Sequence, residues 1–137
     1  MPKLPSVNRP DPDPVQFRHN RLCTSDALEN SGSAIPFEVF YHAQHCSAFA
    51  VRYAGVVYAY LNRCSHVPME MDYLPNQFFD STGHWLMCAT HGAMYAPQTG
   101  HCSLGPCRGG LIKIETSETG GVVYWHTSDK FQPGSSP

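Results

Sequence analysis

The sequence contains few charged residues and no excess of basic ones. Charged residues make up 15% of the 137 residues, and the formal net charge is −2. Proteins that bind nucleic acid through phosphate contacts need clustered lysine and arginine side chains. The composition therefore argues against a nucleic-acid-binding surface.

Long apolar runs are also missing. The longest, such as residues 56–61, have about six residues, whereas a membrane span needs about 20. The first residues, MPKLPSVNRPDPDP, include no apolar stretch of the signal-peptide type. We therefore expect a soluble, cytoplasmic protein without a membrane span.

Helical periodicity of any length is absent, and short strands rich in valine and aromatic residues take its place. Turn residues separate them at short intervals, a pattern typical of an all-β sandwich or barrel. The expected strand at 37–41 precedes three expected hairpins: 48–60 broken at Ala54-Gly55, 78–87 broken at residues 81–83, and 111–115 with 122–125 joined at Gly120-Gly121.

The sequence contains six cysteines but shows no export signal. Because cytosolic thiols are kept reduced, spaced cysteines and histidines then favour metal binding or catalysis over a disulfide framework. No serine, histidine and aspartate residues can be argued to form a hydrolase triad, and no glycine-rich phosphate loop of the usual spacing is present.

One cysteine and one histidine occur in each of two short stretches. Cys64 and His66 follow the apolar run that ends at Leu61. After 21 intervening residues comes Cys88, followed by His91. Both pairs fall in loops after expected strands, so the two loops are able to face each other. Thiolate and imidazole are the ligands of zinc and of iron–sulfur clusters.

The arrangement leaves two kinds of metal site. Zinc fingers usually combine a close pair of cysteines with a close pair of histidines, whereas here each loop supplies one of each. A [2Fe–2S] cluster with both cysteines on one iron and both histidines on the other fits this arrangement better. With two neutral imidazoles the oxidised cluster carries no net charge, so it accepts an electron more readily than an all-cysteine cluster.

The two stretches resemble the motif of the Rieske family. The resemblance comprises Cys-x-His, Cys-x-x-His-Gly, the strand-like YAYLNRCSH before the first loop, a following Tyr95 and Thr99-Gly100, and a third loop, Leu104-Gly105-Pro106. It covers roughly residues 36–126.

The resemblance implies a β-barrel-like base with a small cluster-binding subdomain at about residues 63–107. Residues 1–35 are expected to form an extended arm and the segment leading into the domain, and residues 127–137 a flexible tail. It further implies one [2Fe–2S] cluster, with Cys64 and Cys88 on the inner iron and with His66 and His91 on the outer iron near solvent. No catalytic residue is expected.

Three departures from the family indicate a ferredoxin-type member of low potential. High-potential members carry an extra cysteine in each loop, joined by a disulfide, where this chain has Met69 and Thr90. Ala93 stands where those members often have serine. With fewer hydrogen-bond donors, we expect a potential near about −150 mV. The long gap between the two ligand pairs predicts a reshaped docking rim around residues 73–77.

The remaining candidates are assigned structural roles. Cys23, Cys46, Cys102 and Cys107 are expected to be buried or idle thiols, and Tyr95 to pack beneath the second loop. The His-x-x-His-Cys run at 42–46 is expected to be a loop rather than a second metal site. Solvated charge is the first interpretation of Arg63 and Arg108, and steering of an acidic partner is the alternative.

The function expected from the resemblance is electron transfer by a small monomeric carrier between a reductase and an oxygenase or other redox enzyme. A terminal oxygenase would need a second domain with mononuclear iron, for which no room remains. Two alternatives stay open: a small subunit bound permanently to a larger oxidoreductase, and a structural zinc or redox-sensing module.

Overall fold

The computed structural model describes residues 19–65, 70–72, 74–89, 92–105, 107 and 109–133. Within them the chain forms antiparallel sheets and a single short 3-10 helix, η2 (Ser25–Ala27), so the prediction of an all-β fold is confirmed. The strands are β1 (His19–Thr24), β2 (Ile35–Tyr41), β3 (Gln44–Tyr53), β4 (Val56–Leu61), β5 (Leu86–Met87), β6 (Met94–Tyr95), β7 (Cys102–Leu104), β8 (Lys113–Ile114), β9 (Thr116–Thr119), β10 (Val122–His126) and β11 (Phe131–Pro133).

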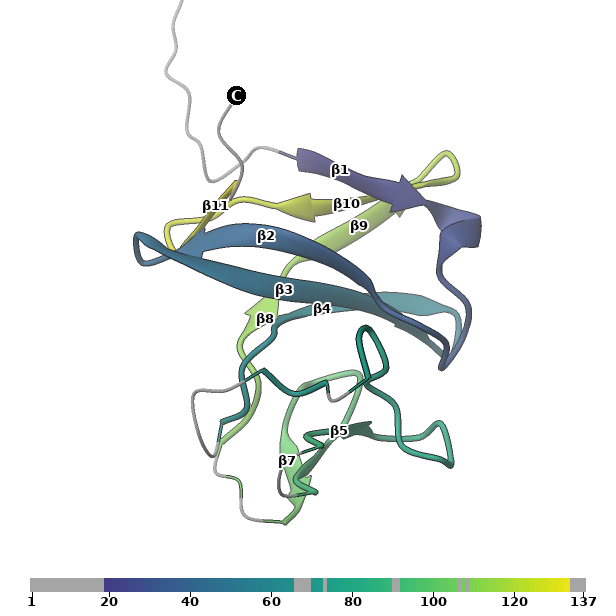
Figure 1. Ribbon diagram of the computed structural model, residues 1–137. Coiled ribbons are helices and arrows are strands. Elements are labelled where there is room, and N and C mark those ends of the chain that lie inside the picture. The colour runs from purple at the N-terminus through teal and green to yellow at the C-terminus, as the bar shows by residue number, and fades with distance from the viewer. Residues whose placement is uncertain are drawn as a thin grey trace, which may run out of the picture.

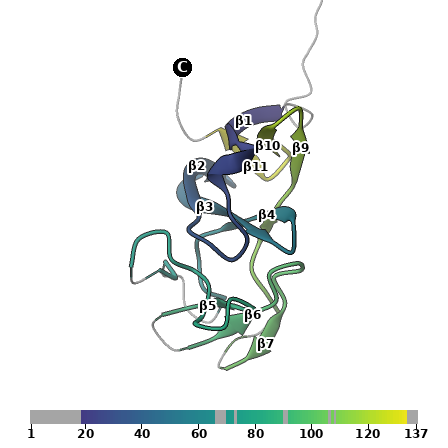
Figure 2. The same cartoon turned by 90° about the vertical axis from the view of Figure 1, so that its right-hand side faces the viewer.

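The sheets lie in three layers, one above another (Figures 1 and 2). The top sheet has the order β1-β10-β9, the middle sheet β11-β2-β3-β4-β8, and the small lower sheet β5-β6-β7. The first cysteine–histidine stretch follows β4 of the middle sheet, and the second lies between β5 and β6 of the lower sheet. No helix among the described residues has the length and apolar character to cross a membrane.

The β3–β4 hairpin has both faces buried, which explains its continuous apolar sequence. Side chains alternate between the two faces of a strand. Ala48 and Ala50 therefore enter the core shared with the top sheet, whereas Phe49 and Val51 enter the core above the lower sheet. Phe49 stacks on Phe78 there, with ring centroids 3.7 Å apart. The hairpin thus forms the wall on which the lower subdomain packs.

Two predicted turns are confirmed at the expected glycines. Ala54 and Gly55 both have positive φ, 51° and 86°, and join β3 to β4. Gly120 and Gly121, with φ of 60° and 78°, join β9 to β10. Two consecutive residues with positive φ match the twist of the flanking strands in a two-residue hairpin.

The predicted pairing of 111–115 with 122–125 is wrong. The two-glycine turn connects β10 directly to β9, whose polar sequence TSET conceals a strand. Residues 113–114 instead form β8 and pair with β4 in the middle sheet. A turn of two residues fixes the register of the strands next to it, so the nearest segment pairs whatever its polarity.

Two strands lie in segments that were expected to be an arm and a tail. β1 pairs with β10, and β11 pairs with β2. Phe131 anchors β11, because its side chain is buried in the upper core. Residues 1–18 and 134–137 lie outside the described residues, and the domain limits at 36 and 126 stay a prediction.

In the lower subdomain, the expected hairpin of residues 78–87 is present but has only a few strand-pairing contacts. Phe79 pairs with Leu86 through an isolated bridge, and Met87 N donates to Phe78 O at 2.7 Å. β5 then continues into the sheet with β6. This short sheet carries Cys88 at its end.

Candidate metal centre

The first loop leaves β4 and is closed by the side chain of Asn62. Asn62 Oδ1 accepts a hydrogen bond from Met71 N at 2.8 Å, and Asn62 Nδ2 donates to Asp72 Oδ1 at 3.0 Å. Residues 62 and 71–72 therefore lie side by side, and Cys64 comes two residues after Asn62 at the start of the first loop. Asn62 was not singled out in the sequence, because its role depends on which backbone groups meet at the loop base.

The second loop follows β5 and is closed by backbone hydrogen bonds. Cys88 N donates to Ala93 O at 2.8 Å, and Gly92 N donates to Cys88 O at 2.9 Å. Gly92 has a φ of +73°, which glycine adopts without strain. Ala89 N donates to Met71 O at 2.9 Å, which ties this loop to the end of the first loop.

The structure brings Cys64 and Cys88 into the same core beneath the two loops. They are 2% and 0% exposed, and neither is in a disulfide. His66 and His91 lie outside the described residues, so their predicted role stays a prediction. Within the described part of the chain, no three histidine, cysteine or acidic side chains are placed to share a metal ion.

Tyr95 connects the second loop to the first through its hydroxyl. It is buried, as predicted, but it also lies 3.4 Å from Cys64 Sγ and 2.9 Å from Ser65 Oγ, and it accepts a hydrogen bond from Ser65 N at 3.1 Å. Burial, followed by the contact with Cys64, raises the pKa of Tyr95. The hydroxyl thus keeps its proton and is able to donate it to a thiolate at Cys64.

The third loop packs directly against the second. Gly105 has a φ of +92°, and a Cβ there would lie 2.9 Å from Ala93 Cα and 3.3 Å from Gly92 O. The third-loop segment Leu104-Gly105 thus lies directly against the second loop, and its expected position over a cluster stays a prediction. Pro106 lies outside the described residues.

The prediction of idle thiols is wrong for Cys102 and Cys107. They form a disulfide across this third loop, with a Cα–Cα distance of 5.8 Å. The expectation rested on a reducing compartment, and it overlooked that a turn at Gly105 brings residues five apart in sequence within disulfide reach.

Cys23 and Cys46 are half-buried and are not in disulfides. Burial raises the pKa of the Cys23 thiol, so it stays protonated. Cys46 Sγ lies 3.7 Å from Arg63 Nη2. The structural role predicted for these two thiols stays a prediction.

The loop predicted for the His-x-x-His-Cys run is shorter than expected, because Gln44, His45 and Cys46 already belong to β3. His42 lies in the turn between β2 and β3 with a φ of 49°, and His45 pairs with Glu38 at 3.1 Å on an exposed surface. Neither histidine is grouped with further ligands among the described residues.

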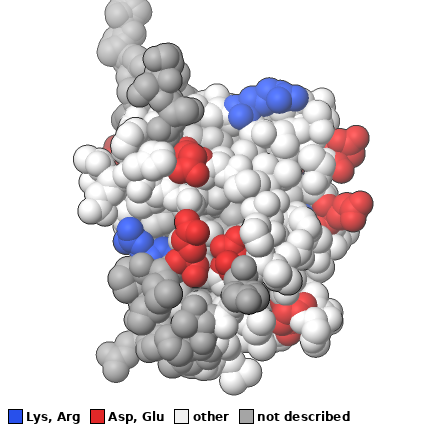
Figure 3. Space-filling view, viewed as in Figure 1, with Lys and Arg blue, Asp and Glu red and all other residues white. Residues whose placement is uncertain are grey.

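Charged side chains of both signs lie beside the first loop (Figure 3). A hollow of about 240 Å³ is lined there by Glu38, His45, Cys46, Ser47, Leu61, Asn62, Arg63 and Glu70. Arg63 also lies over the Tyr41 ring, 6.0 Å from its centroid. Arg63, predicted to be a solvated charge, thus also contacts the side chains of Cys46 and Tyr41. Arg108 lies outside the described residues.

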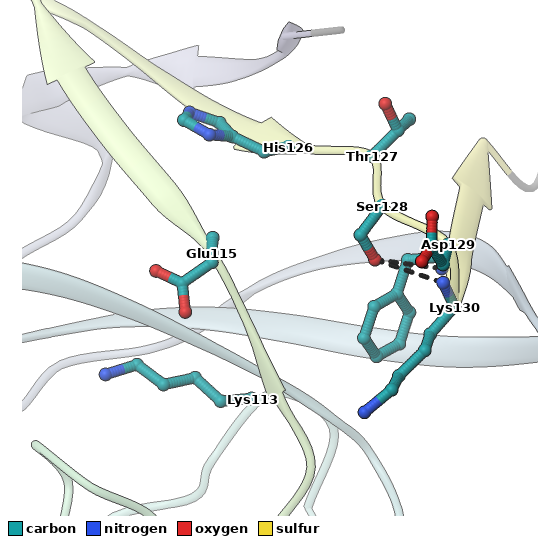
Figure 4. Close-up of a pocket in the computed structure, with 8 residues that line it drawn as sticks. Lys113, Glu115, His126, Thr127, Ser128, Asp129 and Lys130 are labelled. Atoms are coloured by element: carbon teal, nitrogen blue, oxygen red, sulfur yellow. Dashed lines mark hydrogen bonds between the residues drawn. The ribbon is translucent and has the colours of Figure 1, made fainter. Parts of the chain in front are cut away.

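A larger hollow of about 510 Å³ is lined by residues of β8, β10 and β11 and of the segments next to them (Figure 4). Its lining combines Lys113 and Lys130 with Glu115 and Asp129. Lys113 is already engaged, since its Nζ donates to Gln98 O at 3.2 Å and lies 5.3 Å from the Tyr58 ring centroid. The mixed charges do not select one kind of ligand.

The described half of the donor set fits an iron–sulfur cluster. Two buried cysteines from two closed loops share one apolar core, with a hydroxyl donor beside one sulfur. Thiolates in a dry pocket with second-shell donors are the ligands that such clusters use. Among the described residues, the fold and the site together define an all-β protein with two buried cysteines on neighbouring loops.

The chain belongs to the Rieske [2Fe-2S] domain family, whose profile matches residues 19–118. This confirms the resemblance seen in the two Cys/His stretches and extends it toward the N-terminus, over β1. No curated protein matches the sequence.

Solved structures share the fold at low sequence identity. The ferredoxin of carbazole 1,9a-dioxygenase from Nocardioides aromaticivorans IC177 is 21% identical with a TM-score of 0.61, and the match covers 80% of this chain and 97% of that one. A chain from a complex of reduced oxygenase and oxidised ferredoxin of carbazole 1,9a-dioxygenase is 18% identical with a TM-score of 0.63, over 85% and 99% of the two chains. The terminal oxygenase from the same Nocardioides strain is 16% identical with a TM-score of 0.62, over 87% of this chain but 32% of that one.

Proposed function

We propose that this chain is an electron carrier that holds one Rieske [2Fe–2S] cluster on Cys64, His66, Cys88 and His91. The bound cluster supplies one-electron chemistry: it takes up an electron from a reductase and releases it to an oxygenase or another redox enzyme. We further predict that the carrier is monomeric and that it acts in the cytoplasm.

The convergence of Cys64 and Cys88 in one buried core carries the proposal. Asn62 holds the base of the first loop, and two backbone hydrogen bonds close the second. Both sulfurs are removed from water, so they would bind the cluster without competing hydration. Membership of the family supports the two histidines as the remaining ligands.

The structural matches favour a carrier over a catalyst. The matched ferredoxin chain is covered almost completely, whereas only about a third of the oxygenase chain is covered. The complex of an oxygenase with its ferredoxin supports an oxygenase as the electron acceptor here as well.

Cysteine variants of the full chain test the ligand assignment. Cys64→Ser and Cys88→Ser should each abolish the visible absorbance of the cluster and reduce the iron content to background. Cys46→Ser is the matched control, because Cys46 lies outside the site and should leave both unchanged. A protein that keeps its colour and iron after Cys88→Ser would overturn the proposal.

A further inference from the structure

The disulfide between Cys102 and Cys107 closes a small ring at the edge of the cluster-binding subdomain. Cys102 begins β7, Cys107 follows the turn at Gly105, and their Cα atoms are 5.8 Å apart. This distance falls within the range that disulfides adopt. Neither cysteine belongs to the four proposed ligands, so the bond is available for chemistry of its own.

The bond lies where an external thiol is able to reach it. Both cysteines are half-buried, and the residues between them include Ser103, Leu104 and Gly105, which are all exposed. The Leu104 side chain is 63% exposed. Cys64 and Cys88, in contrast, are sealed in the core. Thiol–disulfide exchange requires access to a sulfur, so a thiol reagent discriminates between the two pairs.

The same ring is joined to the cluster pocket through β6. Cys102 pairs with Tyr95 across the lower sheet, and Leu104 pairs with Met94. Tyr95 is the residue whose hydroxyl lies 3.4 Å from Cys64 Sγ. If β7 becomes less well ordered, the change is therefore passed through its pairing with β6 to the contact between Tyr95 and Cys64 Sγ.

A second contact joins the ring to the other ligand loop. The backbone at Gly105 approaches Ala93 so closely that an added Cβ would lie 2.9 Å from Ala93 Cα. Ala93 O in turn accepts the hydrogen bond from Cys88 N. The disulfide thus holds the loop that covers the base of the second ligand loop.

We propose that Cys102–Cys107 is a thiol–disulfide exchange site for a dithiol reductant, and that its state tunes the metal centre. A thiolate of the dithiol attacks one sulfur of the bond and forms a mixed disulfide, and the second thiol of the reductant then releases the chain. Two electrons and two protons pass from the dithiol to the cysteines. The products are two thiols on this chain and a disulfide on the reductant.

The consequence for the metal centre rests on the proposed function. With the bond open, β7 and the turn at Gly105 lose their covalent closure, and Tyr95 is held less firmly against Cys64. A weaker hydrogen bond to the sulfur stabilises the reduced cluster less. The dithiol form is therefore expected to have the lower midpoint potential.

Differential alkylation of the purified full-length holoprotein tests the exchange site. The sample is alkylated with iodoacetamide and digested, either as isolated under air or after treatment with dithiothreitol. We expect Cys102 and Cys107 to be blocked from alkylation before treatment and both alkylated after it, with iron content unchanged. Alkylation of both before treatment, or protection of both after treatment of the native protein, would overturn the proposal.

The tuning is tested by redox titration of the same two samples. The dithiol-treated sample should show a lower midpoint potential and an altered EPR spectrum, and the double variant Cys102→Ser/Cys107→Ser should match it with or without dithiothreitol. Cys46→Ser serves as control and should respond as the native protein does. Equal potentials and spectra in both states would overturn the tuning. Absence of iron from all samples would instead contradict the proposed function, and the alkylation result would still decide the exchange site.

Discussion

Tyr95 links the two ligand loops at the scale of single residues. Its hydroxyl accepts a hydrogen bond from Ser65 N, which leaves its proton for Cys64 Sγ or Ser65 Oγ. Because burial raises the pKa of Tyr95, the proton stays in place through neutral pH. The expectation of few donors to the cluster did not count this hydroxyl.

Removal of that hydroxyl should lower the midpoint potential. In Tyr95→Phe the sulfur loses a donor that stabilises the extra negative charge of the reduced state. With about 1 kcal/mol for the lost hydrogen bond, the shift is roughly 40 mV downward for a one-electron couple. Redox titration followed by visible absorbance measures it.

Tyr60→Phe is the matched control for that substitution. Tyr60 is equally buried, but its hydroxyl donates to Pro97 O at 2.6 Å, away from either cysteine. This variant should lose about 1–2 kcal/mol of stability, because the Pro97 carbonyl is left without its partner, yet keep the native potential. A potential that is the same in Tyr95→Phe as in the native protein would contradict the role of Tyr95.

At the scale of elements, substitutions at two glycines near the third loop distinguish the cost of backbone strain from the cost of a packing clash. Both Gly105 and Gly109 have positive φ, but a Cβ at Gly109 meets no atom within 4 Å, whereas one at Gly105 meets Ala93. Gly109→Ala should cost about 1 kcal/mol. Gly105→Ala should cost more and shorten the half-life of the cluster absorbance, since it pushes the second loop. Thermal unfolding and the decay of absorbance measure both, and equal behaviour of the two variants would contradict close packing of the loops.

Arg52 ties the upper and middle sheets together. Its guanidinium donates to Glu118 with two hydrogen bonds of 3.1 and 2.6 Å, and also to the carbonyls of Leu28, Ser25 and Gly55. The hydrogen bond from Arg52 lowers the pKa of Glu118. A lowered pKa in the folded state contributes stability above the unfolded value of about 4.3, and this stability is lost as the pH falls through the folded value.

Glu118→Gln should therefore destabilise the protein by about 1 kcal/mol at neutral pH, with the difference from the native protein shrinking below about pH 4. Urea unfolding at several pH values measures it. Glu38→Gln is the control: it removes an ion pair with His45 whose side chains are 48% and 56% exposed, so no comparable loss is expected. A pH-independent difference for Glu118→Gln would contradict the assignment.

The elements that could be predicted from the sequence are those with a local cause. The β3–β4 hairpin follows from a continuous apolar run with Gly55 at its turn. β9 was missed because its sequence is polar, and its pairing comes from the two-glycine turn beside it. The disulfide was missed because its closure depends on how the third loop folds, and Asn62 because its partners belong to the far end of a loop.

At the scale of the whole molecule, the β3–β4 hairpin separates two hydrophobic cores among the described residues. One face of β3 and β4 packs against the top sheet, and the other packs against the subdomain that carries both ligand loops (Figure 2). The spacing of the cysteines suggested them as ligands, because ligand chemistry restricts the residue type and the loop context, and that assignment stays a prediction. Their shared burial in the lower core was not predictable, since it depends on the side of the wall to which each loop returns.

The central claim is that the two Cys/His loops hold an iron–sulfur cluster. The most direct measurement is the EPR spectrum of the purified full-length protein after dithionite reduction, together with its iron and zinc content. We predict about two irons per chain and a rhombic signal with a low average g value, as mixed Cys/His ligation produces. One zinc per chain with no EPR signal would contradict the account, because a structural zinc site carries no electron.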